Sequence, residues 1–230
     1  MNIPKIIAAF FLIGYLALIG SSVAVGGRRL PQDVKEVYKK ESIPTNFKTW
    51  SLFLVCNPKW LGADKSQDLK DLYKAFEAFG TTIGPDNAAV WFWKQRQDQQ
   101  DTFFANLDVE RSSKFCSAFK LTPSKGPFVI VTSTYPDESH LSNGLPANSA
   151  VFELGEMQPS QISDLLAQLV DELVKGEKIS AKTTPASKQE AGTWIRLMEA
   201  VQHTLNSFGC AWTFKVEAEG VQAQLHACKG

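Results

Sequence analysis

The sequence carries no net charge and few of the residues that metal and thiol chemistry require. Lys plus Arg and Asp plus Glu number 24 each in 230 residues. No cluster of basic residues is interleaved with aromatic ones, so we expect no nucleic-acid partner. The four cysteines are too few for a disulfide scaffold and show no Cys-x-x-Cys or Cys-x-x-His spacing. His140, His203 and His226 are far apart in the chain. We therefore expect no metal site, no cofactor and no His-based triad.

Charged residues are also missing from the segment 6–27, which follows Lys5. As a helix rising 1.5 Å per residue it would span roughly 33 Å, about the thickness of a bilayer core. It also has the features of a secretory signal, because small residues at 22–24 follow the apolar stretch. The sequence leaves open whether residues 1–27 are a transmembrane anchor or a cleaved signal peptide.

Two features of the sequence predict opposite membrane orientations for this segment. Arg28, Arg29, Lys35, Lys39 and Lys40 follow it, and the positive-inside rule would keep that side cytoplasmic. The extreme N-terminal position and the small-residue site favour export instead. We expect the rest of the chain to be exported to the periplasm or another extracytoplasmic space, with membrane contact through 6–27 if that segment is retained.

The remaining sequence predicts one main domain and an appendage. Residues 28–47 are interpreted as a polar linker, with a short helix allowed around 32–40, and 179–192 as a second linker. Apolar runs predict buried strands, and apolar residues spaced three or four apart predict helices. In the domain at 48–178, strands are expected at 50–56, 88–93, 128–132 and 151–154, and helices at 69–79, 103–119 and 159–175, with Gly80 and Gly176 as helix ends. This order predicts an α/β fold with a mixed sheet between helices.

Two segments of this domain carry a family resemblance. LFLVCNPKWLGADK at 52–65 resembles the active-site region of the thioredoxin-like superfamily, where an apolar strand leads into Trp-Cys-Gly-Pro-Cys-Lys at the start of a helix. Gly126-Pro127, before the strand at 128–132, is similar to the family's Ile-Pro-Thr segment, whose proline is cis and lies beside the redox dithiol. The resemblance covers roughly residues 48–178 and implies a thioredoxin-like mixed sheet flanked by helices.

The sequence departs from the family at the two redox positions. Leu61 and Asp64 stand where the family has cysteines, and neither forms a thiolate or a disulfide. Dithiol exchange by the family mechanism is therefore not expected, and no catalytic residue is assigned. The resemblance implies a peptide-contact edge formed by Trp60, Gly126 and Pro127, where an extended partner would pair through main-chain hydrogen bonds.

Cys56 and Cys116 are interpreted as separate buried side chains that act as small hydrophobic groups. The alternative is a reactive thiol, because the segment 55–58, Val-Cys-Asn-Pro, resembles the Val-Cys-Pro of peroxiredoxins. Phe53 stands where that family has the threonine that polarises the peroxide. This substitution weakens the peroxidase alternative.

The C-terminal segment 193–230 predicts a helix that ends at Gly209, followed by a β-hairpin. A four-residue loop matches the apolar faces of the hairpin and puts Cys210 opposite Ala227, whereas a three-residue loop pairs Cys210 with Cys228. A bulge near the strand ends would satisfy both demands. We favour a Cys210–Cys228 disulfide, since such a small unit buries little core alone.

Three functional hypotheses follow. The first is a redox-inactive thioredoxin-like module of the cell envelope that binds a protein partner or assists assembly. The second is a thiol oxidoreductase or peroxidase that acts through Cys56. The third is a structural subunit of a membrane complex, with the C-terminal segment as the contact.

Overall fold

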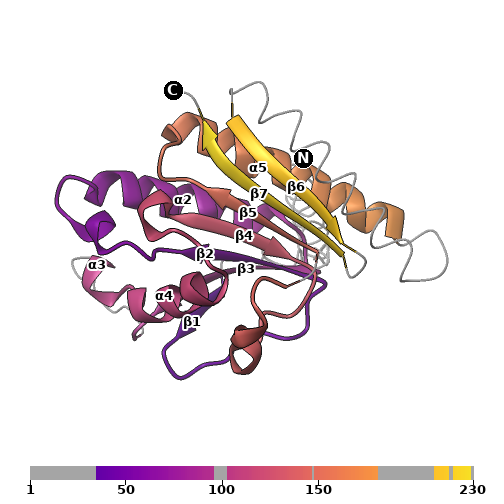
Figure 1. Ribbon diagram of the computed structural model, residues 1–230, viewed down its shortest axis with the longest axis horizontal. Helices are drawn as coiled ribbons and strands as arrows, with labels where there is room; N and C mark the ends of the chain where they lie inside the picture. The colour runs from indigo at the N-terminus through magenta and orange to yellow at the C-terminus, as the bar shows by residue number, and fades with distance from the viewer. Residues whose placement is uncertain (1–34, 96–102, 147, 181–209, 218–219, 229–230) are drawn as a thin grey trace, which may run out of the picture. The chain divides into compact units, whose positions relative to one another are not determined.

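The computed structural model describes residues 35–95, 103–146, 148–180, 210–217 and 220–228 (Figure 1). The segment expected to be an anchor or signal and the helix expected at 193–209 both lie outside these residues. Within the described part of the chain, no helix has the length and apolar character needed to cross a bilayer.

Seven strands form one mixed sheet in the order β1-β3-β2-β4-β5-β7-β6. The strands are β1 (Lys35–Tyr38), β2 (Thr49–Leu54), β3 (Asn87–Trp93), β4 (Phe128–Thr132), β5 (Ser149–Glu153), β6 (Cys210–Glu217) and β7 (Gly220–Cys228). β3 runs parallel to both β1 and β2, whereas β4 is antiparallel to β2 and β5. The predicted α/β class with a mixed sheet is confirmed, and the four strands predicted for the main domain are present.

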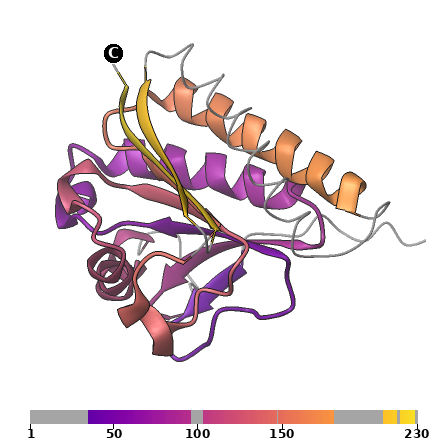
Figure 2. The same cartoon turned by 45° about the vertical axis from the view of Figure 1, so that its right-hand side comes forward.

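Helices cover both faces of the sheet (Figures 1 and 2). They are η1 (Pro58–Leu61), α2 (Ser66–Thr82), α3 (Phe103–Asn106), α4 (Val109–Ala118), η3 (Pro123–Lys125), η4 (Glu138–Asn143) and α5 (Pro159–Ser180). α2 and α5 lie side by side on one face (Figure 2), and α4 packs on the other. Successive residues of a strand point to opposite faces, so Phe53 joins the core under α2 and α5 while Leu52 and Leu54 join the core under α4.

The segment expected to be a linker contributes an edge strand instead. The helix allowed around 32–40 is wrong for its described part, because Lys35–Tyr38 is β1 and pairs with β3. Val37 and Ile43 are both buried in the core under α4. A four-residue strand has too short an apolar pattern to be recognised in sequence, and pairing with β3 decides its conformation.

Two glycines expected to end helices lie inside them. α2 continues past Gly80 to Thr82, and α5 continues past Gly176 to Ser180. An interior glycine weakens a helix by roughly 1 kcal/mol. The buried apolar residues on α2 and α5 outweigh this cost, since both helices pack against the sheet and against each other.

The predicted C-terminal hairpin is present, and its register contains the predicted bulge. Trp212 pairs with Leu225, and a register shift between Ala211 and Trp212 brings Cys210 opposite Cys228. β7 also pairs in parallel with β5, so the hairpin extends the main sheet rather than standing apart from it. The Cys210–Cys228 disulfide itself stays a prediction, supported by this register.

Candidate functional site: the cis-proline edge

The residues singled out by the resemblance gather at one end of the central strands β2 and β4. Leu54, the last residue of β2, pairs with Phe128, the first residue of β4. The chain leaves β2 into residues 57–65 and enters β4 from residues 122–127. We call these two segments together the cis-proline edge, because the Gly126–Pro127 peptide bond is cis, as the resemblance implies.

Two short turns shape the first of these segments. The Asn57 side chain caps η1 by accepting a hydrogen bond from the Lys59 N–H at 3.0 Å. The Gly62 N–H donates to the Lys59 carbonyl at 3.1 Å and ends η1, and the Lys65 N–H donates to the Gly62 carbonyl at 3.1 Å. α2 therefore begins only at Ser66, after the Trp-x-Gly-x-x-Lys stretch. Leu61 is the last residue of η1 and Asp64 lies in the turn that follows, so neither is in the first turn of α2.

The side chains of this segment divide between core and solvent. Trp60 is only 8% exposed and packs in the core under α2 and α5. The Lys65 ammonium lies 5.2 Å from the centre of the Trp60 ring and pairs with the Asp68 carboxylate at 2.9 Å. Leu61 is half-buried against the same core, whereas Asp64 is exposed. Leu61 thus contributes to packing and Asp64 to solvation, and neither side chain can carry thiol chemistry.

The second segment is tied to the end of β5. The Leu154 N–H donates to the Pro127 carbonyl at 2.8 Å, and the Gly155 N–H donates to the Lys125 carbonyl at 3.1 Å. Gly126 and Pro127 are both buried. Of the three residues expected to contact a peptide, Trp60, Gly126 and Pro127, all are therefore covered, and the exposed surface of the edge comes from their neighbours.

The buried carboxylate of Glu153 holds the segment 122–127 through an ion pair. Glu153 is 6% exposed, and its carboxylate pairs with the half-exposed Lys125 ammonium at 3.3 Å. Glu153 lies opposite Phe128 in the β4–β5 register. The ion pair fixes Lys125 directly before Gly126–Pro127. Sequence reasoning missed it, because a glutamate at the end of a short strand is usually solvated.

Cys56 and Cys116 form a disulfide, with their Cα atoms 6.4 Å apart. The interpretation of these two residues as separate buried thiols is therefore wrong. Cys56 is 5% exposed and Cys116 1%, and both belong to the core under α4. The pair is separated by 60 residues in sequence, and the contact depends on α4 packing over the end of β2. Neither residue carries a local signal of this pairing.

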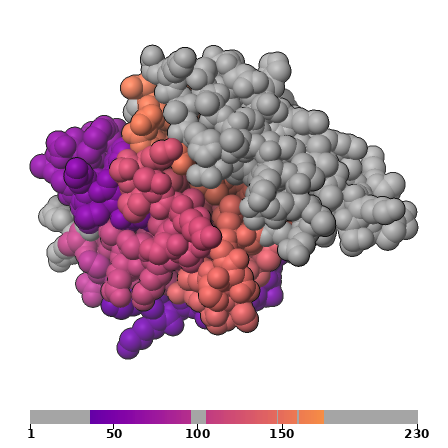
Figure 3. Space-filling view, viewed as in Figure 1, coloured from indigo at the N-terminus to yellow at the C-terminus, as the bar shows by residue number. Residues whose placement is uncertain are grey.

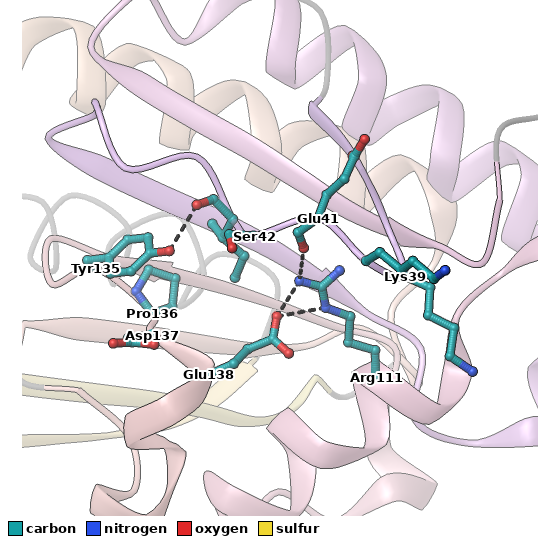
Figure 4. A pocket seen from close by; sticks show the side chains of 10 residues that line it. Lys39, Glu41, Ser42, Arg111, Tyr135, Pro136, Asp137 and Glu138 are labelled. Atoms are coloured by element: carbon teal, nitrogen blue, oxygen red, sulfur yellow. Dashed lines mark hydrogen bonds and ion pairs between the residues drawn. The ribbon is translucent and has the colours of Figure 1, made fainter.

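A second feature, a surface hollow of about 220 Å³, lies between residues 39–43 and 135–138 (Figure 4). Arg111 of α4 forms one wall and is 6% exposed. Its guanidinium donates to the carbonyls of Tyr38 at 3.0 Å and Glu41 at 2.8 Å, and its Nε donates to the Glu138 carboxylate at 2.8 Å. The hollow is lined by Lys39 and Lys40 as well as by acidic residues, so it has no charge preference.

Arg111 belongs to a set of donors that fasten one stretch of backbone. We call residues 38–44 the strap. Besides the two Arg111 contacts, the Tyr135 hydroxyl donates to the Ile43 carbonyl at 2.9 Å and the Trp50 indole N–H to the Pro44 carbonyl at 2.7 Å. The strap, α4 and η4 adjoin one another on the face shown in Figure 3. Arg111 therefore has a structural role, which its position in an amphipathic helix did not reveal.

Within the described residues, no group of three or more His, Cys, Asp or Glu side chains is placed to hold a metal ion. No protein-family model, curated protein or solved structure matches this chain. The fold and the two sites above therefore carry the functional argument.

Proposed function

We propose that the chain is a redox-inactive, thioredoxin-like protein of the cell envelope that binds a protein partner at the cis-proline edge. Two placements support the fold assignment: β2 leads through η1 into α2, and the antiparallel β4 is entered through Gly126–Pro127 beside the end of β2. The observation that carries the function is the absence of sulfur at positions 61 and 64 of this edge, where leucine and aspartate stand.

The exposed residues of the edge supply the contact surface in this proposal. Trp60, Gly126 and Pro127 are buried beneath this surface and support the backbone that carries it. The exposed groups above them are Pro58, Lys59, Ala63, Asp64, Thr122, Pro123 and Ser124. Prolines, an alanine and small hydroxyl residues lose little side-chain entropy when a partner covers them. Such a surface suits an extended peptide segment of a partner protein.

The Cys56–Cys116 disulfide supports export. Disulfides persist in secreted and periplasmic proteins and are rare in the cytosol. Intact mass of the mature protein from its native host, reduced and non-reduced, tests this part of the proposal. Loss of the N-terminal segment near Ala24, or a disulfide in the isolated protein, is the expected result. A mass beginning at Met1 with four free thiols would contradict export.

The thiol-enzyme alternative requires a Cys56 thiolate that reaches its substrate. The burial of Cys56 and Cys116 favours an inert role, because a buried sulfur in apolar surroundings is a poor nucleophile. Iodoacetamide alkylation of the reduced protein separates the two hypotheses. Alkylation of Cys56 near neutral pH at a rate above that of an unstructured cysteine would indicate a lowered thiol pKa and favour the enzyme.

The structural-subunit alternative assigns the contact to the C-terminal hairpin. Because β7 pairs with β5, deleting the hairpin would expose the edge of β5 and disturb the main domain. Substitutions on the hairpin test this alternative better than a deletion. Unchanged co-purification of all partners with a Lys215→Glu variant would argue against it.

Restoring the dithiol tests the placement of the edge directly. The double substitution Leu61→Cys, Asp64→Cys returns two cysteines to positions three residues apart. We expect the wild-type protein not to catalyse insulin reduction, and the double variant to form a new disulfide and acquire this activity. The single variants Leu61→Cys and Asp64→Cys are the matched controls and should remain inactive. Insulin reduction by the wild type would refute the redox-inactive assignment.

A site-specific crosslink tests partner binding. A photo-crosslinking residue placed at Asp64 or Ser124, both exposed on the edge, should give an adduct with the same partner in the native host. The matched control is Glu77, an exposed residue of α2 outside the edge. Equal adducts from Glu77 and Asp64 would mean that the edge is not the binding surface.

A further inference from the structure

The Cys56–Cys116 disulfide joins the residue that precedes the first segment of the cis-proline edge to α4, the helix that precedes the second segment. Cys56 lies two residues beyond Leu54, at the start of the segment that leads to Trp60. Cys116 lies near the end of α4, and the chain from α4 leads directly to Gly126–Pro127. The disulfide therefore fixes one segment relative to the other.

The connection from Cys116 to the proline is closely hydrogen-bonded. The Leu121 N–H donates to the Cys116 carbonyl at 2.9 Å, and the Lys120 N–H donates to the Ser117 carbonyl at 3.2 Å. The Gly126 N–H donates to the Pro123 carbonyl at 3.2 Å, and Leu121 is buried. Because these bonds leave little slack, a displacement of Cys116 moves the loop that carries Gly126 and Pro127.

α4 has a thin apolar contact with the sheet. α2 buries Leu69, Leu72, Phe76 and Phe79, whereas the apolar residues that α4 buries are Phe115 and Cys116. The Phe115 ring stacks on Phe92 with 5.2 Å between ring centres. Val109 and Ala118 are only partly buried against the core, and the C-cap residue Phe119 is buried beside Phe115. The disulfide and Arg111, which lies over the Phe92 ring and binds the strap and Glu138, add to this attachment. Segments with few buried apolar contacts open at lower free energy than the rest of a fold.

We propose that the disulfide acts as a redox-sensitive lock on the cis-proline edge. With the disulfide intact, α4 and residues 119–127 are held in the conformation described above. When a dithiol reduces it, α4, residues 119–127 and the strap loosen, while α2 and α5 stay packed on the other face. That the lock controls partner binding rests on the proposed function, in which the cis-proline edge is the binding surface. The lock itself does not depend on that proposal.

The chemistry is thiol–disulfide exchange. A thiolate of the dithiol attacks one sulfur of the pair and forms a mixed disulfide, and its second thiolate displaces the remaining cysteine. Two electrons and two protons are gained by Cys56 and Cys116, and the dithiol leaves as its own disulfide. Because both sulfurs are buried, the attack follows a local opening of α4.

Amide hydrogen exchange of the oxidised and the dithiothreitol-reduced protein tests the lock. The measured quantity is the ratio of exchange rates in α4 and residues 119–127 to those in α2. We expect this ratio to rise roughly tenfold or more on reduction, with the strap following α4. A loss of global stability alone does not raise this ratio, so an unchanged or lower ratio overturns the proposal. Unfolding of the whole domain on reduction overturns it as well.

The double variant Cys56→Ala, Cys116→Ala provides an independent measurement. Its exchange ratio should equal that of the reduced wild type, and dithiothreitol should change it no further. If dithiothreitol still raises the ratio in this variant, the effect comes from Cys210 and Cys228 and the proposal fails. Failure of the insulin or crosslinking experiments would leave this exchange result unaffected, so the two proposals fail separately.

Discussion

Gly155 lies so close to Gly126 that no side chain fits between them. A Cβ atom on Gly155 would stand 2.6 Å from the Gly126 carbonyl oxygen and 2.7 Å from that of Lys125. Both obstacles are backbone atoms, which cannot rotate away as the end of a long side chain can. The end of β5 therefore packs directly against the cis-proline edge, although it carries none of the residues that the family resemblance singles out.

The substitution Gly155→Ala should push the segment 125–127 away from β5. We expect a loss of about 1–3 kcal/mol in the free energy of unfolding, as for other overpacked sites, measured by urea denaturation. Amide exchange should rise at Leu154 and Gly155, whose N–H groups donate to Pro127 and Lys125.

Gly144→Ala is the control for this substitution. Gly144 has a φ of +82°, but a Cβ there would be no closer than 3.9 Å to another atom. It should cost about 1–2 kcal/mol through backbone conformation alone. Amide exchange at Leu154 and Gly155 should stay unchanged. If Gly155→Ala behaved like this control, the close approach would have no structural role.

Sequence reasoning succeeded where one short segment carries the information. Continuous apolar runs predicted β2, β3 and β4, and the Gly-Pro before β4 led to the cis bond through the family resemblance. It failed where the information lies in a distant partner. The extended conformation of β1 depends on its pairing with β3. The oxidation state of Cys56 depends on Cys116, which lies 60 residues further along the chain in α4. No pattern within either segment reports such a partner.

Arg111 should prove to be one of the most sensitive charged positions in the domain. Arg111→Met removes the donors to Tyr38 and Glu41 and leaves Glu138 without its cation. Since Glu138 is half-exposed and regains water, we expect a loss of about 2–3 kcal/mol rather than the larger penalty of a fully buried pair. Arg111→Lys should recover little, because one ammonium cannot reach acceptors on two sides.

Lys114→Met is the matched control, since Lys114 lies on the same helix in an exposed pair with Glu110 at 3.5 Å. Its effect should stay within about 0.5 kcal/mol. Urea denaturation of the three variants at one pH gives the comparison. Equal losses for Arg111→Met and Lys114→Met would show that the strap is held by its apolar residues alone.

Ser51 is a buried residue whose hydroxyl group should be removable without a loss in the free energy of unfolding. Its side chain is fully buried in β2, and its hydroxyl has no hydrogen-bond partner among the described residues. A buried hydroxyl without a partner opposes folding, so Ser51→Ala should leave stability unchanged or raise it by about 1 kcal/mol.

Thr132→Val is the contrasting variant at the neighbouring strand. The Thr132 hydroxyl accepts a hydrogen bond from the Thr134 N–H at 3.1 Å and donates to the Thr134 carbonyl at 3.2 Å. Its loss should cost about 1 kcal/mol. Thermal unfolding of both variants gives the sign of each effect, and a clear loss for Ser51→Ala would contradict the assignment of an unsatisfied hydroxyl.

Alkaline stability should depend on Tyr73. Burial raises the pKa of the Tyr73 phenol well above its ordinary value of 10, and the nearby carboxylates of Glu77 and Glu36 raise it further. The ring packs edge-on against Trp91, with 4.8 Å between ring centres. The folded state therefore holds the phenolic proton at a pH where the unfolded chain has released it. The stability that this provides is complete below pH 10 and is lost as the pH rises above that value.

Tyr73→Phe removes this proton linkage. At pH 7 the variant should be slightly less stable than the wild type, because the phenol's hydrogen bond to Glu36 is lost. Above pH 10 the wild type should lose stability more steeply than the variant, by at most about 1.4 kcal/mol per pH unit. Urea denaturation across this range measures the two slopes. The raised pKa of Tyr135 is common to both proteins, so it does not affect their difference. Parallel slopes would mean that Tyr73 ionises in the folded protein as readily as in the unfolded chain.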